Sequence, residues 1–409
     1  MKQATKNFTH MKSSLLNNYS RYPVEFVEGK GANLFDSEGN SYLDFLSGIA
    51  VTGFGHQHKE ITESAEEQLN KLWHVSNLFE AAPQEELAKK LTAATGLDSV
   101  FFCNSGTEAN EAAIKFARKW GGDRKNIISA NGGFHGRTMG SLSATGQKNL
   151  WKGFAPMLMG FSFVDFNNIE QVENSIDEAT CAILIEPIQG ESGVIVPDKN
   201  YLNKLRTICD KNNILLILDE VQTGIGRTGK LFAHQWYDVI PDIITSAKGI
   251  ANGLPLGAVI CSDKISDVIK PGDHGSTFGA NPVAVAAGNK VFDLLNPELL
   301  KNINQLGLII KESIWDIESD LIKIIRGKGL MIGIELINPL AKKIALELLN
   351  EKIVVGTSGD SVIRLLPPFI ISKNEIKEFV KIFKSVVSKF SFSDRTSDIV
   401  TINNQKIGE

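Results

Sequence analysis

Three short polar segments contain the side chains that are most suited to chemistry. The first is residues 104–110, Asn-Ser-Gly-Thr-Glu-Ala-Asn. It follows an apolar run and opens a helical pattern, so the free N–H groups and the positive end of that helix meet at Ser105, Gly106 and Thr107. Small residues there can hold a phosphate group. The alternative is an ordinary helix N-cap.

An acid and a lysine follow two other apolar runs. Asp219 lies in residues 218–224 (Leu-Asp-Glu-Val-Gln-Thr-Gly), and Lys248 lies in residues 245–249 (Thr-Ser-Ala-Lys-Gly). A charge at the end of a buried strand is costly unless it has a partner. A capping aspartate and a lysine whose amine reaches solvent would each explain one segment. A phosphate-binding turn, an acid and a lysine in one chain instead predict a shared ligand site.

The elements that must position these segments are short apolar strands alternating with helices. Strands are expected at residues 100–103, 126–129, 182–186, 214–219, 243–246 and 257–261. Helices are expected at residues 108–120, 201–211, 282–295, 298–317 and 374–390. Unbroken apolar runs between helices are typical of a mostly parallel sheet covered by helices. In such sheets ligands bind at the carboxyl ends of the strands, where the three segments lie.

The bulk composition restricts the class of protein. The chain has 409 residues, of which 43% are hydrophobic and 22% charged, as in ordinary globular proteins. Its net charge of -4 argues against nucleic acid or an acidic membrane surface as a partner, and no apolar run is long enough to cross a membrane. Four widely spaced cysteines predict a reducing compartment, here the cytoplasm. His56 and His58 are read as a pair of loop histidines, so no metal is expected.

Changes of composition predict four parts. Residues 1–60 form an N-terminal arm and a segment of a small domain, residues 61–296 a large ligand-binding domain, residues 297–390 a C-terminal small domain, and residues 391–409 a polar tail that is expected to be disordered. The first 19 residues contain no acid and no apolar stretch suited to secretion. A flexible arm is expected there, and an organellar transit peptide is the alternative.

Residues 224–230 are also compatible with another class of protein, one that binds nucleotides. The segment Gly-Ile-Gly-Arg-Thr-Gly-Lys fits a GxGxxG pattern and most of a nucleotide-binding phosphate loop. Leu231 stands where such a loop needs a hydroxyl to bind Mg²⁺. A nucleotide-binding protein is therefore the weaker alternative.

The three polar segments, together with residues 186–191 (Glu-Pro-Ile-Gln-Gly-Glu), resemble the motifs of class III aminotransferases of fold type I. The resemblance runs from about Tyr19 to about Phe390. It implies an α/β fold, with a large domain on a mostly parallel seven-stranded sheet and a smaller α+β C-terminal domain. It also implies pyridoxal 5'-phosphate (PLP) as cofactor and a homodimer with shared active sites. Within the class, residues 48–51 (Gly-Ile-Ala-Val) and the overall length are most similar to acetylornithine aminotransferases.

The resemblance assigns roles around the cofactor. Lys248 would carry PLP as a Schiff base and move a proton, Asp219 would keep the pyridine nitrogen protonated, Phe134 would stack on the ring, and Gln222 would bind the phenolic oxygen. The implied cofactor site comprises Ser105, Gly106, Thr107, Phe134, Asp219, Glu220, Val221, Gln222, Lys248 and, from the neighbouring subunit, Thr277.

Substrate recognition would depend on two of the few arginines. Arg137 would bind a substrate carboxylate, and Arg364 the α-carboxylate of glutamate or 2-oxoglutarate. Glu191 would cover Arg364 while a terminal-amine donor is bound and swing away for the oxo acid. The alternative is a structural ion pair between Glu191 and Arg364. Three further substrate contacts are implied, namely Tyr19, Ile49 and Ser276.

The expected reaction moves the terminal amine of N-acetylornithine to 2-oxoglutarate, as in arginine biosynthesis. Ornithine aminotransferases resemble the chain closely but have, at the position of Ile49, a tyrosine that can meet a free α-ammonium. Isoleucine offers no such partner. Ornithine, succinylornithine, succinyldiaminopimelate and 4-aminobutyrate stay open as donors. A glutamate-1-semialdehyde aminomutase is a more distant alternative, and the presence of both Lys248 and Asp219 argues against an inactive relative.

Overall fold

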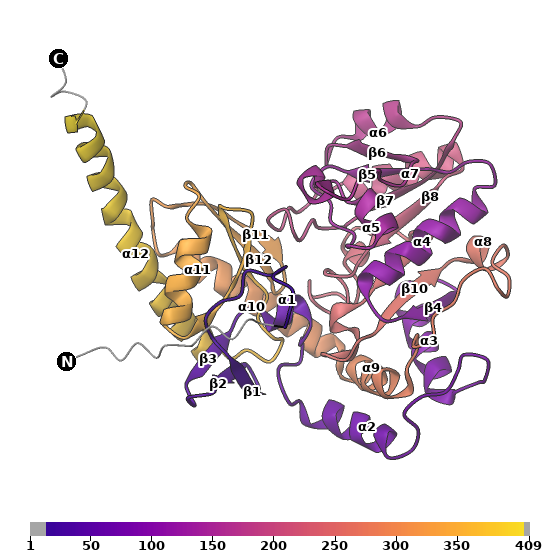
Figure 1. Cartoon of the computed structure of the whole chain (residues 1–409), viewed down its shortest axis with the longest axis horizontal. Helices are drawn as coiled ribbons and strands as arrows, with labels where there is room; N and C mark the ends of the chain where they lie inside the picture. The colour runs from indigo at the N-terminus through magenta and orange to yellow at the C-terminus, as the bar shows by residue number, and fades with distance from the viewer. Residues whose placement is uncertain (1–13, 405–409) are drawn as a thin grey trace.

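The computed structural model describes residues 14–404, and its largest element is a seven-stranded sheet covered by helices on both faces (Figure 1). In spatial order the strands are β4 (Ser99–Cys103), β10 (Gly257–Cys261), β9 (Ile243–Ser246), β8 (Leu215–Asp219), β7 (Thr180–Ile185), β5 (Asn126–Ala130) and β6 (Phe161–Val164). Only β10 runs antiparallel to its neighbours. The predicted α/β fold with a mostly parallel seven-stranded sheet is confirmed.

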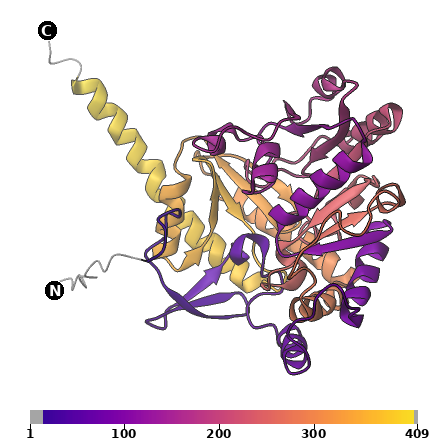
Figure 2. The same ribbon diagram turned by 45° about the vertical axis from the view of Figure 1, so that its right-hand side comes forward.

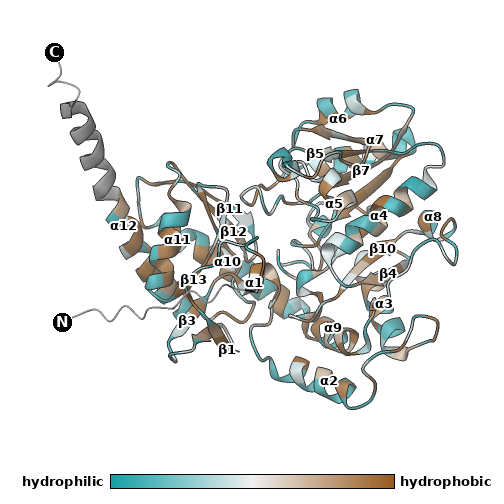
Figure 3. Ribbon diagram, in the orientation of Figure 1, coloured by the Kyte–Doolittle hydropathy of each residue, from teal (hydrophilic) through white to brown (hydrophobic). Residues whose placement is uncertain are grey.

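Buried apolar runs form the centre of this sheet, as the sequence predicts. Every residue of β7, β8, β9 and β10 is buried, and the central strands are mostly brown in Figure 3. The sequence analysis missed β6, the edge strand, whose first three residues are only half-buried. An edge strand is covered less completely, so its four residues do not form a continuous apolar run.

Alternating residues of one strand pack against different helices. In β10, Val259 and Cys261 join the apolar cluster of α4 (Gly106–Trp120) on one face. Ala258 and Ile260 join the cluster of α3 (Ala82–Thr95) and α9 (Pro282–Leu294) on the other. Farther along the sheet, α6 (Ile169–Ser175) and α7 (Tyr201–Asn212) cover that second face. The shorter helices of this domain are α5 (Met139–Ala144), α8 (Asp263–Ser266), and the 3-10 turns Lys148–Trp151, Ala233–Trp236 and Lys248–Ala251.

The N-terminal and C-terminal segments combine in a second region beside the large sheet (Figures 1 and 2). One four-stranded sheet is β1 (Phe26–Lys30), β2 (Asn33–Asp36), β3 (Ser41–Asp44) and β13 (Ile353–Val354), and the other is β11 (Ile322–Lys328), β12 (Met331–Leu336), β15 (Val362–Leu365) and β14 (Gly356–Ser358). The helices outside the large layers are α1 (Ser47–Ala50), α2 (Lys59–Leu69), α10 (Pro297–Trp315), α11 (Ala341–Asn350) and α12 (Lys373–Asn404). The rings of Phe45 and Phe379 stack at 4.1 Å, joining the two ends of the chain in one core.

The C-terminal helix differs from its expected length. The sequence analysis ends it at Phe390 and expects a disordered tail, whereas α12 continues to Asn404. Residues 391–404 contain neither glycine nor proline, so nothing in them stops a helix. Most of the expected N-terminal arm, residues 1–13, and the last five residues of the expected tail lie outside the described residues. Between residues 14 and 404 no helix is long and apolar enough to span a membrane.

Candidate active site

The three polar segments meet at one edge of the large sheet. Strands β4 and β9 run in the same direction because β10 is antiparallel to both. Ser105, Asp219 and Lys248, which end or follow β4, β8 and β9, therefore reach one cavity of about 400 Å³. Ten of the expected site residues line it: Ser105, Gly106, Thr107, Phe134, Arg137, Glu191, Asp219, Val221, Gln222 and Lys248.

The N-terminus of α4 forms one wall of the cavity. Ser105 has extended backbone, and its hydroxyl accepts a hydrogen bond from the N–H of Glu108 at 3.3 Å. The N–H groups of Gly106 and Thr107, between these two residues, have no acceptor within the helix, so they are free for an anion. A Cβ on Gly106 would lie 2.7 Å from Val221, which shows why a glycine is needed at this close approach. The turn therefore has the shape and polarity of a phosphate cradle.

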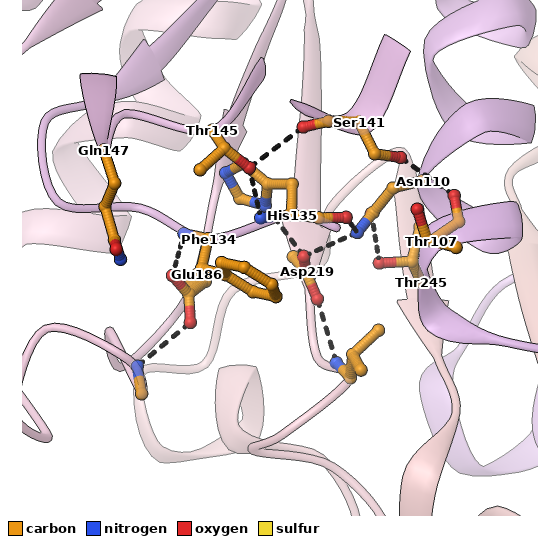
Figure 4. A network of polar contacts seen from close by, with 12 residues as sticks. Thr107, Asn110, Phe134, His135, Ser141, Thr145, Gln147, Glu186, Asp219 and Thr245 are labelled. Carbon is orange, nitrogen blue, oxygen red and sulfur yellow. Dashed lines mark hydrogen bonds and ion pairs between the residues drawn. The ribbon is translucent and has the colours of Figure 1, made fainter. Parts of the chain in front are cut away.

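A network of buried polar groups holds Asp219 (Figure 4). Its Oδ2 accepts hydrogen bonds from Nδ1 of His135 at 2.7 Å and from Nδ2 of Asn110 at 2.8 Å. Its Oδ1 accepts from the N–H of Val221 at 3.0 Å. Asn110 is itself fixed by the hydroxyl of Thr245, 2.9 Å from its Oδ1. Three donors around this buried carboxylate satisfy both of its oxygens and hold it in one orientation.

Lys248 is held in a strained conformation just after β9, the strand next to β8. Its φ is +46°, in the left-handed region that residues with a side chain seldom adopt. Strain of this kind is concentrated at functional sites. Burial lowers the pKa of the Lys248 amine, although the negative charge of Glu191 opposes this effect. A buried lysine with a lowered pKa has more of the neutral amine that nucleophilic chemistry requires.

Phe134 and Arg137 form the outer part of the cavity. The Phe134 ring is half-buried, and its backbone N–H donates to Oε1 of Glu186 at 2.9 Å. The exposed guanidinium of Arg137 lies over this ring, 5.7 Å from its centroid. A flat apolar face beside an exposed cation suits a planar ring with a carboxylate-bearing substrate above it.

Arg364 lies behind the cavity wall and is covered by Glu191. Its Nη1 is 2.5 Å from Oε1 of Glu191, and only 2% of Arg364 is exposed. Gln222 contacts both groups, donating to Glu191 at 3.2 Å and accepting from Arg364 at 3.3 Å. Burial alone would raise the pKa of Glu191, but the charge of Arg364 lowers it below its usual value. The pair is closed, so Glu191 and not Arg364 faces the cavity.

Besides Arg364, five expected site residues of this chain do not line the cavity. The Glu220 carboxylate points instead into the loop that follows β8, where it accepts from the N–H groups of Ala233 and His234 at 2.8 Å each. Tyr19 and Thr277 are exposed, and Ser276 is bonded to Asn104. Ile49 is 39% exposed.

Ile49 belongs to a left-handed turn. Residues 47–50 have φ values of +50°, +61°, +68° and +63°, and Val51, which follows them, lines the cavity. A left-handed conformation costs roughly 1–2 kcal/mol for each residue with a side chain. The Asp44 carboxylate caps this turn by accepting from the N–H groups of Leu46 and Ser47 at 2.8 Å each. The sequence analysis singled out Ile49 but not this conformation.

The structure adds three polar residues that the sequence analysis did not name as site residues: Asn110, His135 and Glu186. Asn110 and Glu186 lie inside motifs already described, and His135 lies between the expected site residues Phe134 and Arg137. The signal was thus available, but only the fold reveals that these side chains turn inward to the same cavity.

The glycine-rich loop of residues 224–230 takes no part in the cavity. Arg227 is fully buried within it and donates to the backbone oxygens of Leu330 and Pro367. A Cβ on Gly229 would meet Asn304 at 2.1 Å, so the loop is packed against α10 with no space for a phosphate. His56 is bonded to Asp44 at 2.9 Å, and no group of three metal-binding side chains occurs between residues 14 and 404.

Comparison with known proteins places this site in a family context. The family Aminotransferase class-III matches residues 15–387. The acetylornithine aminotransferase of Caldanaerobacter subterraneus is 44% identical over 392 residues, covering 94% of this chain and all of the relative. That of Aquifex aeolicus is 46% identical over 378 residues, covering 91% and 99%. The structure of a Toxoplasma gondii ornithine aminotransferase with PLP at partial occupancy in its active site is 32% identical, with a TM-score of 0.87 and coverage of 91% and 92%.

Proposed function

The chain belongs to the class III aminotransferases, and from that premise we propose that it transfers the terminal amino group of N-acetylornithine to 2-oxoglutarate with PLP as cofactor. The products are N-acetylglutamate semialdehyde and glutamate. The observation that carries the proposal is the joint placement of Lys248, Asp219 and the closed Glu191–Arg364 pair at one cavity. The names of the relatives support the choice of donor.

The residues around the cavity fit PLP. The free N–H groups at the start of α4 suit its phosphate, and the carboxyl group of Asp219 suits its ring nitrogen. Phe134 offers a face for the ring, and Val221, packed on Gly106, also lines the cavity. The buried Lys248 amine is the group that would hold its aldehyde carbon.

When bound, PLP supplies a carbonyl that takes up an amino group and a protonated ring that withdraws electrons. The chain's own residues do the rest. Asp219 would keep the proton on the ring nitrogen, and His135 and Asn110 fix the orientation of its carboxylate. The Lys248 amine would remove a proton from the carbon that bears the terminal amine of the donor and return it to the carbon on the other side of the transferred nitrogen, two bonds away. Arg137, at the mouth, orients the donor by its carboxylate.

The two substrates demand different states of one pocket. N-acetylornithine carries its reacting amine at the far end from its carboxylate, whereas 2-oxoglutarate has a carboxylate next to its reacting carbon. In the closed state Glu191 neutralises Arg364, which favours the first substrate. For the second, Glu191 must move so that Arg364 can form a charge-assisted bond with the α-carboxylate. A glutamate-1-semialdehyde aminomutase would have no need of such an exchange.

We further propose a homodimer that completes this site. A patch of exposed apolar side chains lies beside the cavity and consists of Leu72, Trp73, Leu78, Phe79 and Phe278. A second, mostly apolar hollow that contains Trp73 and Phe278 shares Asn104, Leu254 and Pro255 with the active-site cavity. Exposed apolar patches of this kind mark interaction surfaces. A second copy seated there would bring Thr277 of the partner subunit to the phosphate cradle.

All four cysteines are buried and unpaired, which supports our placement of the enzyme in a reducing compartment, the cytoplasm.

The test of the proposed donor is a side-by-side comparison of terminal-amine donors with 2-oxoglutarate. N-acetylornithine should have the highest kcat/KM, about 5- to 150-fold above ornithine, because the apolar side chain of Ile49, in the turn that leads to the cavity-lining Val51, offers an α-ammonium no hydrogen-bond partner. Ile49→Tyr should shift this ratio towards ornithine. A wild-type ratio at or below one would contradict the donor assignment and leave the aminotransferase activity intact.

A further inference from the structure

Glu186 is a buried acid of the cavity that the reaction described above does not use. It follows β7 and lines the same cavity as Lys248 and Asp219. Its Oε1 accepts a hydrogen bond from the N–H of Phe134 at 2.9 Å, and its Oε2 accepts one from the N–H of Gly190 at 3.0 Å. Figure 4 shows Glu186 beside Phe134, on the side of the ring away from Thr245.

The two N–H groups belong to two different functional parts of the site. Phe134 supplies the ring-stacking wall. Gly190 immediately precedes Glu191, and its carbonyl accepts from Nη1 of Arg364 at 3.3 Å. A Cβ on Gly190 would lie 2.4 Å from Oε1 of Gln222, so this backbone is also in tight contact with the residue that bonds to both Glu191 and Arg364. The Glu186 carboxylate therefore connects the Phe134 wall to the segment that carries Glu191, the residue that covers Arg364.

Peptide N–H groups, and not an arginine or lysine, hold this carboxylate. Burial raises the pKa of Glu186 to about 7, an effect opposed by the nearby His135 and increased by Asp219. If residue 186 had only a structural role, an amide or an apolar side chain would fill it without the cost of burying a charge. The acid is the residue type that can accept two N–H groups on two separate oxygens.

We propose that Glu186 is a positioning residue that fixes Phe134 and the Gly190–Glu191 segment relative to each other, and so holds the Glu191–Arg364 gate closed around the terminal-amine donor. The role of the gate rests on the proposed function, whereas the bridge between the two segments does not. Glu186 acts through Phe134 and Glu191, so its removal should alter substrate preference more than the chemical step itself.

The bridge can be tested by hydrogen exchange on the holoenzyme. Glu186→Gln keeps the shape, but a carboxamide accepts at one oxygen only and turns an N–H towards the second donor. The peptide whose N–H faces the new amide group should exchange at least about fivefold faster, the value of one lost hydrogen bond, and the other peptide should also exchange faster because it is no longer tied to the first. The matched control is Asp242→Asn, another buried acid that accepts a backbone N–H, from Leu216 at 2.8 Å. It should leave both peptides unchanged. Faster exchange in only one peptide, or in neither, would overturn the bridge.

The effect on the gate can be tested by single-turnover rates with each amino donor. In Glu186→Gln the rate with glutamate, relative to that with N-acetylornithine, should rise at least about threefold, and Asp242→Asn should leave this ratio unchanged. Equal slowing with both donors would overturn the proposed gating role. If Glu186→Gln does not fold, Glu186→Asp, which keeps the charge but cannot span both N–H groups, serves for the same two measurements. A wild-type enzyme that uses neither donor would refute the proposed function, and the exchange experiment would still decide the bridge.

Discussion

Lys248 and Asp219 face one cavity from neighbouring strands, and their surroundings differ. Burial lowers the pKa of the Lys248 amine and so favours the neutral form. Asp219 is surrounded by three donors, from His135, Asn110 and the Val221 N–H, which hold its side chain in one orientation. A nucleophilic amine and an acid held at the same cavity are the two groups that amino-group transfer requires.

The covalent link between the cofactor and Lys248 gives the most direct test of a single residue's role. Borohydride treatment of the purified yellow protein should fix the cofactor on Lys248, as peptide mapping by mass spectrometry would show. Lys248→Ala should retain cofactor through the α4 cradle but lose transamination by about 10²–10⁴-fold or more. Lys264→Ala, in which the removed amine is bonded to Asp242 outside the cavity, is the control and should stay active. An adduct on any other lysine would refute the role of Lys248.

Asp219→Asn isolates the charge of the acid. The amide has nearly the same shape but cannot hold the proton on the ring nitrogen. We expect kcat to fall at least ~10²-fold, about 2.7 kcal/mol of barrier, with a smaller loss of cofactor. Steady-state kinetics and cofactor absorbance measure the two effects. Turnover close to that of the wild type would show that Asp219 has no such role.

Among the structural elements, two irregular segments control the shape of the site. The segment after β7 carries Glu186, Gly190 and Glu191, so one loop supplies both the proposed bridge and the gate. The left-handed turn at residues 47–50 brings Val51 to the cavity from the N-terminal segment. Neither is a regular helix or strand, which fits the rule that binding functions gather on loops held by a rigid scaffold.

The gate predicts opposite effects for its two members. Glu191→Ala leaves Arg364 uncovered, so glutamate should react better relative to the terminal-amine donor. Arg364→Ala should slow the half-reaction with 2-oxoglutarate at least about tenfold, the value of one charge-assisted hydrogen bond, and affect the other half-reaction less. Single-turnover kinetics separate the two halves. Equal slowing of both by each variant would identify Glu191–Arg364 as a structural ion pair.

The described residues pack around four apolar clusters but leave an apolar surface beside the cavity. The exposed patch around Trp73 and Phe278 is next to Thr277, which the single chain leaves in solvent. Both facts have one explanation if a second copy covers the patch. Assembly would then be part of the active site and would not merely add stability.

Trp73→Lys tests this assembly. Trp73 is 70% exposed in the single chain, and a lysine there would place a charge within the proposed interface. The dimer should become about 30-fold weaker or more, as for an interface residue that contributes strongly, and should lose cofactor as it dissociates. Trp315→Lys is the matched control, because Trp315 is 64% exposed but lies at the end of α10, and it should leave the dimer intact. Analytical ultracentrifugation gives both results. A wild-type monomer with full activity would refute the shared site.

Much of the fold could be predicted because its signals are local. The apolar runs of β7, β8 and β9 are legible in the sequence, since a parallel strand buried on both faces has few polar residues. Helix starts at Gly106 and Pro282 follow from capping chemistry. The edge strand β6 and the extension of α12 were missed, because an edge strand has a weaker pattern and a polar segment carries no clear stop signal.

Some features of the site could likewise be predicted from the sequence, and others depend on the tertiary structure. The sequence alone identified Ser105, Asp219 and Lys248 as residues that end or follow strands, because the direction of a parallel sheet brings such ends to one edge. Only the tertiary structure could show that the Glu220 carboxylate points away from the cavity while its neighbour Asp219 points towards it. Successive side chains leave a strand in opposite directions, and contacts from distant segments decide which one faces the ligand. The bridge from Glu186 to Phe134 and Gly190 likewise depends on a contact 52 residues apart in the chain, which no local pattern encodes.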